Sequence, residues 1–130
     1  MLYTGVMFKS EKFTIKQLAD LAGVSIRALH YYDEIGLLKP HAIANNGYRQ
    51  YDDQSVIRLQ QIRFYRELDF PLADIRDILN QPQFDVVASL QTQRASLQAR
   101  SRRLDQLIQT IDKTIATLEG KMKMTPTEYF

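Results

Sequence analysis

Basic and tyrosine side chains gather between residues 14 and 51 in a pattern suited to binding rather than to catalysis. Arg27, His30 and Tyr31 recur at helical spacing, and Tyr48 and Arg49 directly follow a glycine. An arginine guanidinium can donate paired hydrogen bonds to phosphate or to guanine, whereas tyrosine hydroxyls mostly fix position on the phosphate backbone. These residue types therefore indicate a surface shaped to a duplex rather than to a small substrate.

No set of residues supports an enzyme. The sequence contains no nucleophile–base pair, no phosphate-binding glycine loop and no carboxylate dyad. It also has no cysteine, which excludes disulfides, thiol nucleophiles and thiolate metal ligands. His30 and His41 belong to different predicted elements and lack partners at ligand spacing, so we expect neither a metal nor another cofactor.

Length and composition indicate one compact domain with an appendage. The 130 residues are 45% apolar and 25% charged, and no apolar run approaches the ~18 residues of a membrane span. Met1–Ser10 lacks the features of a secretory signal, so we expect a cytoplasmic protein. The net charge is only +2, and residues 1–80 hold ten Lys and Arg against ten Asp and Glu. A nucleic-acid surface would therefore need its cations sorted onto one face.

The order of caps and apolar positions predicts a helix-turn-helix. Thr14 is a suitable N-cap for a first helix, which Gly23 ends in the left-handed conformation. Ser25 then caps a second helix over Ile26–Glu34, and Gly36 closes it. The apolar face of the first helix comprises Ile15, Leu18, Ala19, Leu21 and Ala22.

The second helix has one face for the core and one for a ligand. Leu29 and Tyr32 are three residues apart and are expected to point inward, which leaves Arg27, His30 and Tyr31 on the other side. The alternative is that both tyrosines are half-buried and close a small core. Helical spacing cannot place both inside, so we expect a structural role for Tyr32 rather than for Tyr31.

A hairpin is predicted after the two helices. Asn46-Gly47 is typical of a two-residue turn, with flanking strands over Leu37–Ala44 and Tyr48–Tyr51. By itself this could be an ordinary surface hairpin. Its position directly after a helix-turn-helix favours a β-wing.

Two further helices complete the predicted domain. The third spans about Ser55–Leu68, after caps at 52–55, and the fourth begins at Pro71 and ends at 80–83. Their inward positions are Val56, Leu59, Ile62 and Tyr65 or Arg66 in the third helix, and Leu72, Ile75, Ile78 and Leu79 in the fourth.

Residues Val86–Glu119 contain neither glycine nor proline and predict one long helix of about 50 Å. Its heptad positions are Leu90, Leu97, Leu104, Ile111 and Leu118, with Arg94, Ser101, Ile108 and Ile115 at the companion positions. Such a stripe requires a partner helix, and a homodimer is the simplest source. Packing back on the chain's own helices is the alternative, but the stripe is too long for it.

The expected fold class is all-α with a small β-wing, a winged helix-turn-helix followed by a long dimerisation helix. We assign residues 1–12 to an N-terminal extension, 13–83 to the winged helix-turn-helix and 84–119 to a coiled-coil dimerisation helix. Residues 120–130 are assigned to a linker toward a missing effector domain, because Thr125 and Pro126 are typical of the start of another helix.

The assembled motifs resemble the MerR family of transcription regulators over about residues 13–119. The specific blocks are Ser25–Asp33, Ile35–Pro40, Gly47–Tyr51 and Phe64–Leu72. Residues 84–118 and the tail 125–130 are most similar to the multidrug-responsive and thiopeptide-responsive branch.

The resemblance implies a bacterial activator that binds double-stranded promoter DNA as a homodimer. Such dimers occupy a palindrome between promoter elements that are too far apart for RNA polymerase. They bend and untwist this spacer, so polymerase is affected indirectly. The long helices pair antiparallel. A small-molecule effector, such as a drug or antibiotic, is implied only for a form with the further C-terminal domain.

The resemblance also implies which residues contact DNA and which form the dimer. The DNA-binding positions are Thr14, Ser25, Arg27, His30, Tyr31, Tyr32, Lys39, Tyr48, Arg49 and Arg66. The dimerisation positions are Leu90, Leu97, Leu104, Ile108, Ile111, Ile115 and Leu118. Arg49 and Tyr31 are the strongest candidates, whereas Arg66 could simply belong to a solvated helix face.

Three other interpretations stay open from the sequence. A metal-sensing or redox-sensing relative would need cysteines at the ends of the long helix, and their absence favours a drug-type sensor. A naturally short regulator could sense a ligand between the long helix and the reading domain. The chain could also be a coiled-coil interaction module that DNA binding merely tethers.

Overall fold

The computed structural model describes residues 11–130, in two compact units that meet within one long helix. The first unit runs to Leu90 and the second begins at Gln91. Expectations for Met1–Ser10 lie outside the described residues. No helix in the described part of the chain has the length and apolar character to span a membrane.

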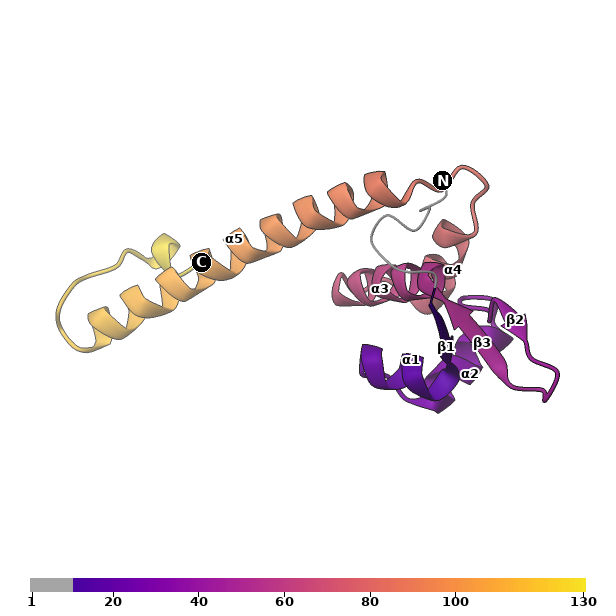
Figure 1. Ribbon diagram of the computed structural model, residues 1–130. Coiled ribbons are helices and arrows are strands. Elements are labelled where there is room, and N and C mark those ends of the chain that lie inside the picture. Colours follow the sequence, from indigo (N-terminus) through magenta and orange to yellow (C-terminus); the bar gives the residue numbers. More distant parts are fainter. Residues whose placement is uncertain (1–10) are drawn as a thin grey trace. The chain divides into compact units, whose positions relative to one another are not determined.

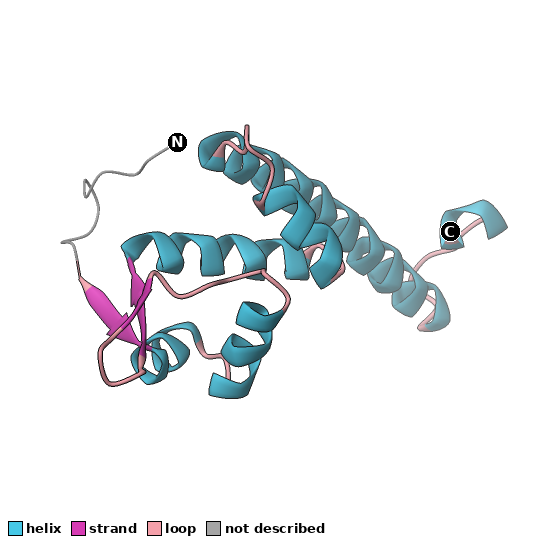
Figure 2. Ribbon diagram, turned by 90° about the vertical axis from the view of Figure 1, so that its right-hand side faces the viewer, coloured by secondary structure: helices cyan, strands magenta, loops and turns pink. Residues whose placement is uncertain are grey.

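The first unit is mostly helical with one small sheet, as the fold class predicted (Figure 1). Its elements in chain order are β1 (Lys12–Thr14), α1 (Ile15–Ala22), α2 (Ile26–Glu34), β2 (Ala42–Ile43), β3 (Arg49–Asp52), α3 (Asp53–Glu67) and α4 (Leu72–Leu79). The strands lie side by side next to the start of α3 (Figure 2).

The sheet has a strand that the sequence did not indicate. Within residues 11–130 the strands form an antiparallel sheet of order β1-β3-β2, in which Phe13 pairs with Tyr51 and Ile43 with Arg49. Strand β1 is short and runs directly into the cap of α1, so its hydrophobic alternation is too brief to detect. It places Phe13 against the core.

The prediction of a two-residue turn was wrong. Ala44 and Tyr48 form the last pair, with the Ala44 N–H donating to the Tyr48 carbonyl at 2.8 Å, so residues 45–47 make a three-residue loop. The Gly47 N–H donates to the Ala44 carbonyl at 2.9 Å, and Gly47 has φ +83°. A three-residue loop closed by a left-handed glycine is one of the common hairpin connections.

The predicted first wing strand, 37–44, is also much shorter than expected. Leu37 and Leu38 are buried, and both of their N–H groups donate to the Tyr32 carbonyl. These bonds tie the segment to the end of α2 and not to the sheet. Only Ala42–Ile43 pairs as β2.

Caps define the helix-turn-helix as predicted. Thr14 forms a capping box with Gln17, and the Ser25 hydroxyl accepts a hydrogen bond from the Ala28 N–H at 2.9 Å. Gly23 has φ +68°, and the N–H of Val24 donates to the Ala19 carbonyl at 3.2 Å. These local bonds fix where α1 ends and α2 begins.

A single apolar core holds the first unit together. Its fully buried side chains include Leu18 and Leu29, from the two helices of the motif. The inward positions predicted for α3 and α4 are buried or packed on the core. The remaining buried members are Ala19, Leu37, Leu38, Tyr51, Leu59, Ile62, Tyr65, Ile75 and Leu79. The prediction for Leu21 was wrong, since it is 67% exposed and lies beside the apolar stripe of α1.

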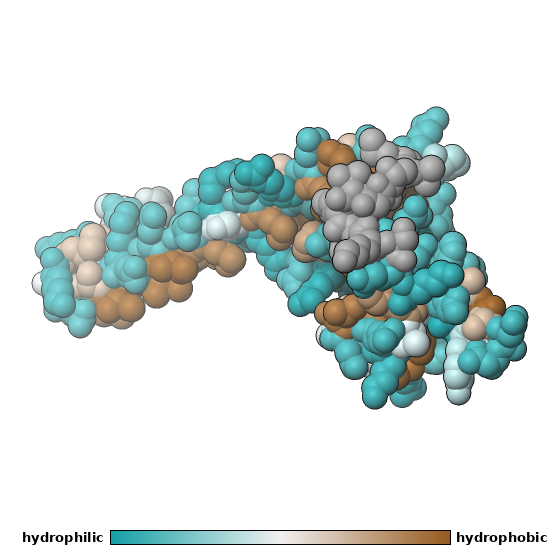
Figure 3. Space-filling model, in the orientation of Figure 1, coloured by the Kyte–Doolittle hydropathy of each residue, from teal (hydrophilic) through white to brown (hydrophobic). Residues whose placement is uncertain are grey.

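The second unit consists mainly of α5, which spans Val86–Leu118 as predicted. An apolar band follows this helix in Figure 3. The chain then turns back along the helix, and the Thr114 hydroxyl lies 3.9 Å from the Met124 sulfur. A short 3₁₀ helix, Pro126–Tyr129, follows Thr125, at the predicted helix start.

Candidate nucleic-acid interface

Helix α2 presents the predicted reading face. Arg27 and Tyr31 are exposed, with Tyr31 at 49%, and His30 is half-buried between them. Leu29 is fully buried on the opposite side. Tyr32 is half-buried and packs against the core, which fits the structural role expected for it. The helix therefore offers a guanidinium and a phenol to a ligand while its other face is anchored.

The wing brings two more candidate residues next to this helix. Tyr48 is 71% exposed at the end of the hairpin loop, and its N–H donates to the Asn46 side-chain oxygen at 3.1 Å. Arg49 is the first residue of β3 and is only partly exposed. Thus Tyr48 is free to reach a ligand, whereas Arg49 is held by a neighbour.

That neighbour is Asp33, near the end of α2. Arg49 Nε donates to Asp33 Oδ2 at 3.1 Å, and Lys39 Nζ lies 3.5 Å from Asp33 Oδ1 and 3.3 Å from the Asp33 carbonyl oxygen. One carboxylate thereby joins two predicted DNA-binding cations. The role of Asp33 was not predictable from the sequence, because a contact across sixteen residues has no signature in local spacing.

The Tyr51 side chain packs close to this ion pair. It is fully buried, and its hydroxyl has no hydrogen-bond partner among the described residues. Burial raises the pKa of Tyr51, Asp33 raises it further, and Arg49 opposes both.

The end of α2 is held by side chains from α3 and α4. Three successive backbone carbonyls, at positions 35–37, accept hydrogen bonds from Arg76 at 3.4 Å, Asn80 at 3.3 Å and Arg58 at 2.7 Å. Arg58 also donates to the Leu79 carbonyl and to the Asn80 side chain. These contacts satisfy the carbonyls of the segment that directly follows α2 and tie this segment to α3 and to the end of α4.

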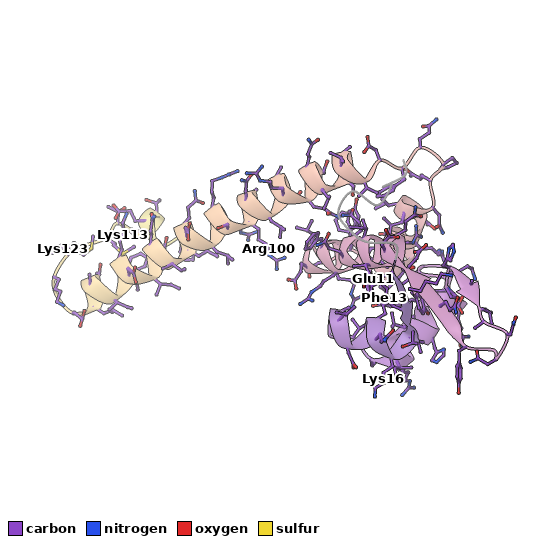
Figure 4. The ribbon with its side chains drawn as sticks, viewed as in Figure 1. Glu11, Phe13, Lys16, Arg100, Lys113 and Lys123 are labelled. Atoms are coloured by element: carbon purple, nitrogen blue, oxygen red, sulfur yellow. The ribbon has the colours of Figure 1, made fainter. Side chains whose placement is uncertain are left out.

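The other predicted contact residues lie on separate elements. The Thr14 and Ser25 hydroxyls already accept backbone hydrogen bonds as caps. Arg66 is exposed on α3, where Arg63 instead donates to the Ala22 carbonyl at 3.3 Å. The structure thus brings Lys39 and Arg49 together but leaves Thr14, Ser25 and Arg66 outside their cluster. Lys16 also projects from α1 in Figure 4.

The two histidines lie on different parts of the first unit. His41 Nδ1 lies 3.1 Å from Asp52 Oδ2, and Asp52 also caps α3. His30 lies on α2. Across residues 11–130 no three metal-binding side chains come together.

The predicted dimerisation positions lie on the apolar side of α5. Leu90 and Leu97 are half-buried, and the later positions are largely exposed, reaching 82% at Leu118. Leu107, which the heptad pattern did not include, is 51% exposed and adjoins the same stripe. The members of the stripe from residue 104 onward are Leu104, Ile108, Ile111, Ile115 and Leu118.

The fold and this surface define a winged helix-turn-helix protein with a long C-terminal helix. Two family profiles match the chain: "MerR HTH family regulatory protein" over residues 13–82 and "MerR, DNA binding" over residues 56–120. The chain therefore belongs to the MerR family of helix-turn-helix regulatory proteins, as the four sequence blocks indicated.

Three curated relatives share most of this chain. The transcriptional regulator SkgA of Caulobacter vibrioides is 52% identical over 91% of the chain. The transcriptional activators mta of Bacillus subtilis and TipA of Streptomyces coelicolor are 44% and 39% identical, over 92% and 91% of it. The matches cover 46%, 46% and 47% of these relatives, so the chain spans about half their length.

Two solved structures of relatives resemble this chain. The crystal structure of SkgA from Caulobacter crescentus is 50% identical, with a TM-score of 0.88 over 94% of this chain and 88% of that one. The N-terminal part of Mta, described as a multidrug transporter activator from Bacillus subtilis, is 48% identical. It has a TM-score of 0.55 over 79% of this chain and 97% of that one.

Proposed function

We propose that this chain is the DNA-binding and dimerisation part of a transcription activator. In this proposal a homodimer binds a palindromic promoter and bends and untwists the spacer between two promoter elements. The observation that carries it is the exposed face of α2 beside a wing, on a chain that also has an unpartnered apolar helix face. Membership of the MerR family supports both parts.

The proposed DNA contacts divide by the kind of group. Arg27, His30 and Tyr31 on α2 enter the major groove, where an arginine can read guanine. Tyr48 and Arg49 of the wing contact the flanking phosphates. The remaining proposed contacts bind phosphate at the edges of the site, from Thr14, Ser25, Tyr32, Lys39 and Arg66.

Dimerisation is proposed through α5. Ile108, Ile111 and Ile115 are each about half exposed, so covering each of them fully contributes about half of the roughly 1.5–3 kcal/mol that full burial of such a side chain gives. Two copies of the stripe would be covered by antiparallel pairing, which offsets the cost of association. Paired helices would also set the separation of the two α2 helices on the palindrome.

Activation and sensing are proposed from the relatives. Two of them are named activators, and the solved part of Mta is described as a multidrug transporter activator. We propose that residues 13–83 bind DNA, that 84–119 pair, and that 120–130 lead into an effector domain in a longer form. That domain would bind a drug or antibiotic. Such a protein acts in the cytoplasm and catalyses no reaction.

Selection of duplexes from a randomised library tests DNA binding. The chain should enrich a two-fold symmetric sequence, and the combined Arg27→Ala and Arg49→Ala variant should enrich none. A wild-type chain that folds but enriches no sequence would overturn the proposal. Arg100, at the middle of α5, provides the control Arg100→Ala, which should enrich the wild-type sequence (Figure 4).

A further inference from the structure

The Asp33 carboxylate is shared by two cations that come from different segments. Its Oδ2 accepts from Arg49 of β3 at 3.1 Å, and its Oδ1 faces Lys39 of the segment after α2 at 3.5 Å. One negative and two positive charges leave this cluster with an excess of one positive charge. It can therefore still attract an anion although each cation already has a partner.

The contact with Arg49 leaves most of the guanidinium available. Arg49 uses Nε toward Asp33, and no hydrogen bond within the described residues involves its terminal nitrogens. Those nitrogens carry the remaining N–H donors of the planar group. An arginine fixed through Nε therefore has its terminal donors held in one direction and free to bind phosphate.

The surroundings shield this ion pair from solvent more than an ordinary surface pair. The Asp33 and Arg49 side chains are only 20% and 34% exposed. Ion pairs shielded in this way are screened less by salt than exposed ones. The buried Tyr51 side chain lies on the same face of β3, two residues beyond Arg49, but its hydroxyl has no partner. The side-chain link between α2 and β3 is therefore the hydrogen bond that Arg49 donates to Asp33.

We propose that Asp33 is a positioning residue, which fixes Arg49 against α2 so that its terminal nitrogens meet a DNA phosphate. The inference rests on the proposed function and deepens it. The bond sets the distance between the wing and the reading helix before DNA arrives, so less side-chain freedom is lost on binding. Asp33 itself touches no DNA in this account.

The proposal is testable because positioning and charge have opposite effects on DNA affinity when Asp33 loses its carboxylate. A carboxylate near phosphates repels them, so its removal should by charge alone strengthen binding. Positioning predicts that the same removal weakens binding. Asp33→Asn keeps the shape and removes the charge. Asp20, exposed on α1, gives the matched control Asp20→Asn, with the same change of charge outside the cluster.

The experiment measures affinity for the duplex that the wild-type chain selects from a randomised library, at several salt concentrations. Asp33→Asn should raise the dissociation constant by about fivefold to tenfold and should reduce the salt slope by about one, like Arg49→Ala. Asp20→Asn should leave affinity unchanged or improve it. In the Arg49→Ala background, Asp33→Asn should cause no further loss of affinity, because the loss passes through Arg49 and only the charge effect, which favours binding, remains.

A role limited to folding gives a different result. In that case Asp33→Asn would lower the melting temperature and leave the salt slope unchanged. It would also weaken binding further in the Arg49→Ala background. That outcome, or unchanged or tighter binding by Asp33→Asn, overturns the inference. If Arg49→Ala weakens binding and Asp33→Asn does not, the proposed function stands and only this inference fails. A wild-type chain that selects no duplex overturns both.

Discussion

The arginines of the first unit have two different roles: some can reach a ligand, and others hold the fold together. Arg27 and Arg49 are placed to reach a ligand, whereas Arg58 has three acceptors within the protein. Burial lowers the pKa of the Arg58 guanidinium, which nevertheless remains charged at neutral pH. Arg58 is only partly buried, but a charge that makes three hydrogen bonds within the protein is still costly to remove.

Replacing Arg58 by methionine tests this support. Arg58→Met keeps the apolar stem but leaves the carbonyls of residues 37 and 79 without their donor. We expect a loss of on the order of 3 kcal/mol in the free energy of unfolding, measured by urea denaturation. Arg66→Met, at an exposed position on the same helix, should change it by less than about 0.5 kcal/mol. Equal effects of the two variants on the free energy of unfolding would refute this supporting role of Arg58.

The raised pKa of Tyr51 predicts that the free energy of unfolding depends on pH in the alkaline range. Its folded-state pKa lies above the ordinary tyrosine value of 10.0 because burial and Asp33 disfavour the phenolate. A raised pKa means that the proton is held more tightly in the folded state. The corresponding stability is fully present below pH 10 and is lost as the pH rises above it. Tyr51→Phe should show a smaller loss of stability than the wild type above pH 10.

The measurement is the midpoint of urea unfolding from pH 7 to pH 11. At pH 7 the variant should be as stable as the wild type or more stable, since the hydroxyl it removes has no partner. A larger alkaline loss in the variant, or parallel curves, would show that Tyr51 does not titrate in this way.

Residue roles were predictable where they depend on near neighbours. Thr14, Gly23 and Ser25 act through bonds to residues at most four positions away, so their types and spacing were sufficient. Asp33 and Arg58 act across sixteen to twenty-two positions. Only the packed fold brings those partners together.

At the scale of elements, the helices were predicted better than the strands. Long apolar periods identified α3, α4 and α5, and their observed bounds lie close to the predicted ones. The strands are only two to four residues long, too short for a reliable period. The segment 37–44 was mistaken for a strand because Leu37 and Leu38 belong to the core through tertiary packing.

The exposed apolar stripe of α5 predicts how a charge within it affects dimerisation. Ile111 lies in the middle of the exposed stripe, and a charge there would have to be desolvated on pairing. Ile111→Asp should therefore convert a dimer to a monomer at micromolar concentration in sedimentation velocity. Gln109→Asp, exposed on the same helix but outside the heptad positions, should remain dimeric. A wild-type chain that sediments as a monomer would contradict pairing through α5.

At the scale of the whole molecule, the proposed function requires both a DNA-binding unit and a helix that pairs with a second copy. The residue order alone indicated both parts, because the four blocks and the heptads are local patterns. Family membership and the relatives named activators support their joint role in regulating transcription. Activation in this proposal requires deformation of the DNA, since a dimer that only bound would not change the spacing of promoter elements.

Energy transfer between dyes at the two ends of the selected duplex tests this claim most directly. We predict that saturation with the wild-type chain raises the transfer efficiency, because bending brings the ends closer together. Ile111→Asp should raise it less at equal occupancy. A duplex saturated with the wild-type chain whose transfer efficiency equals that of free DNA would contradict the account.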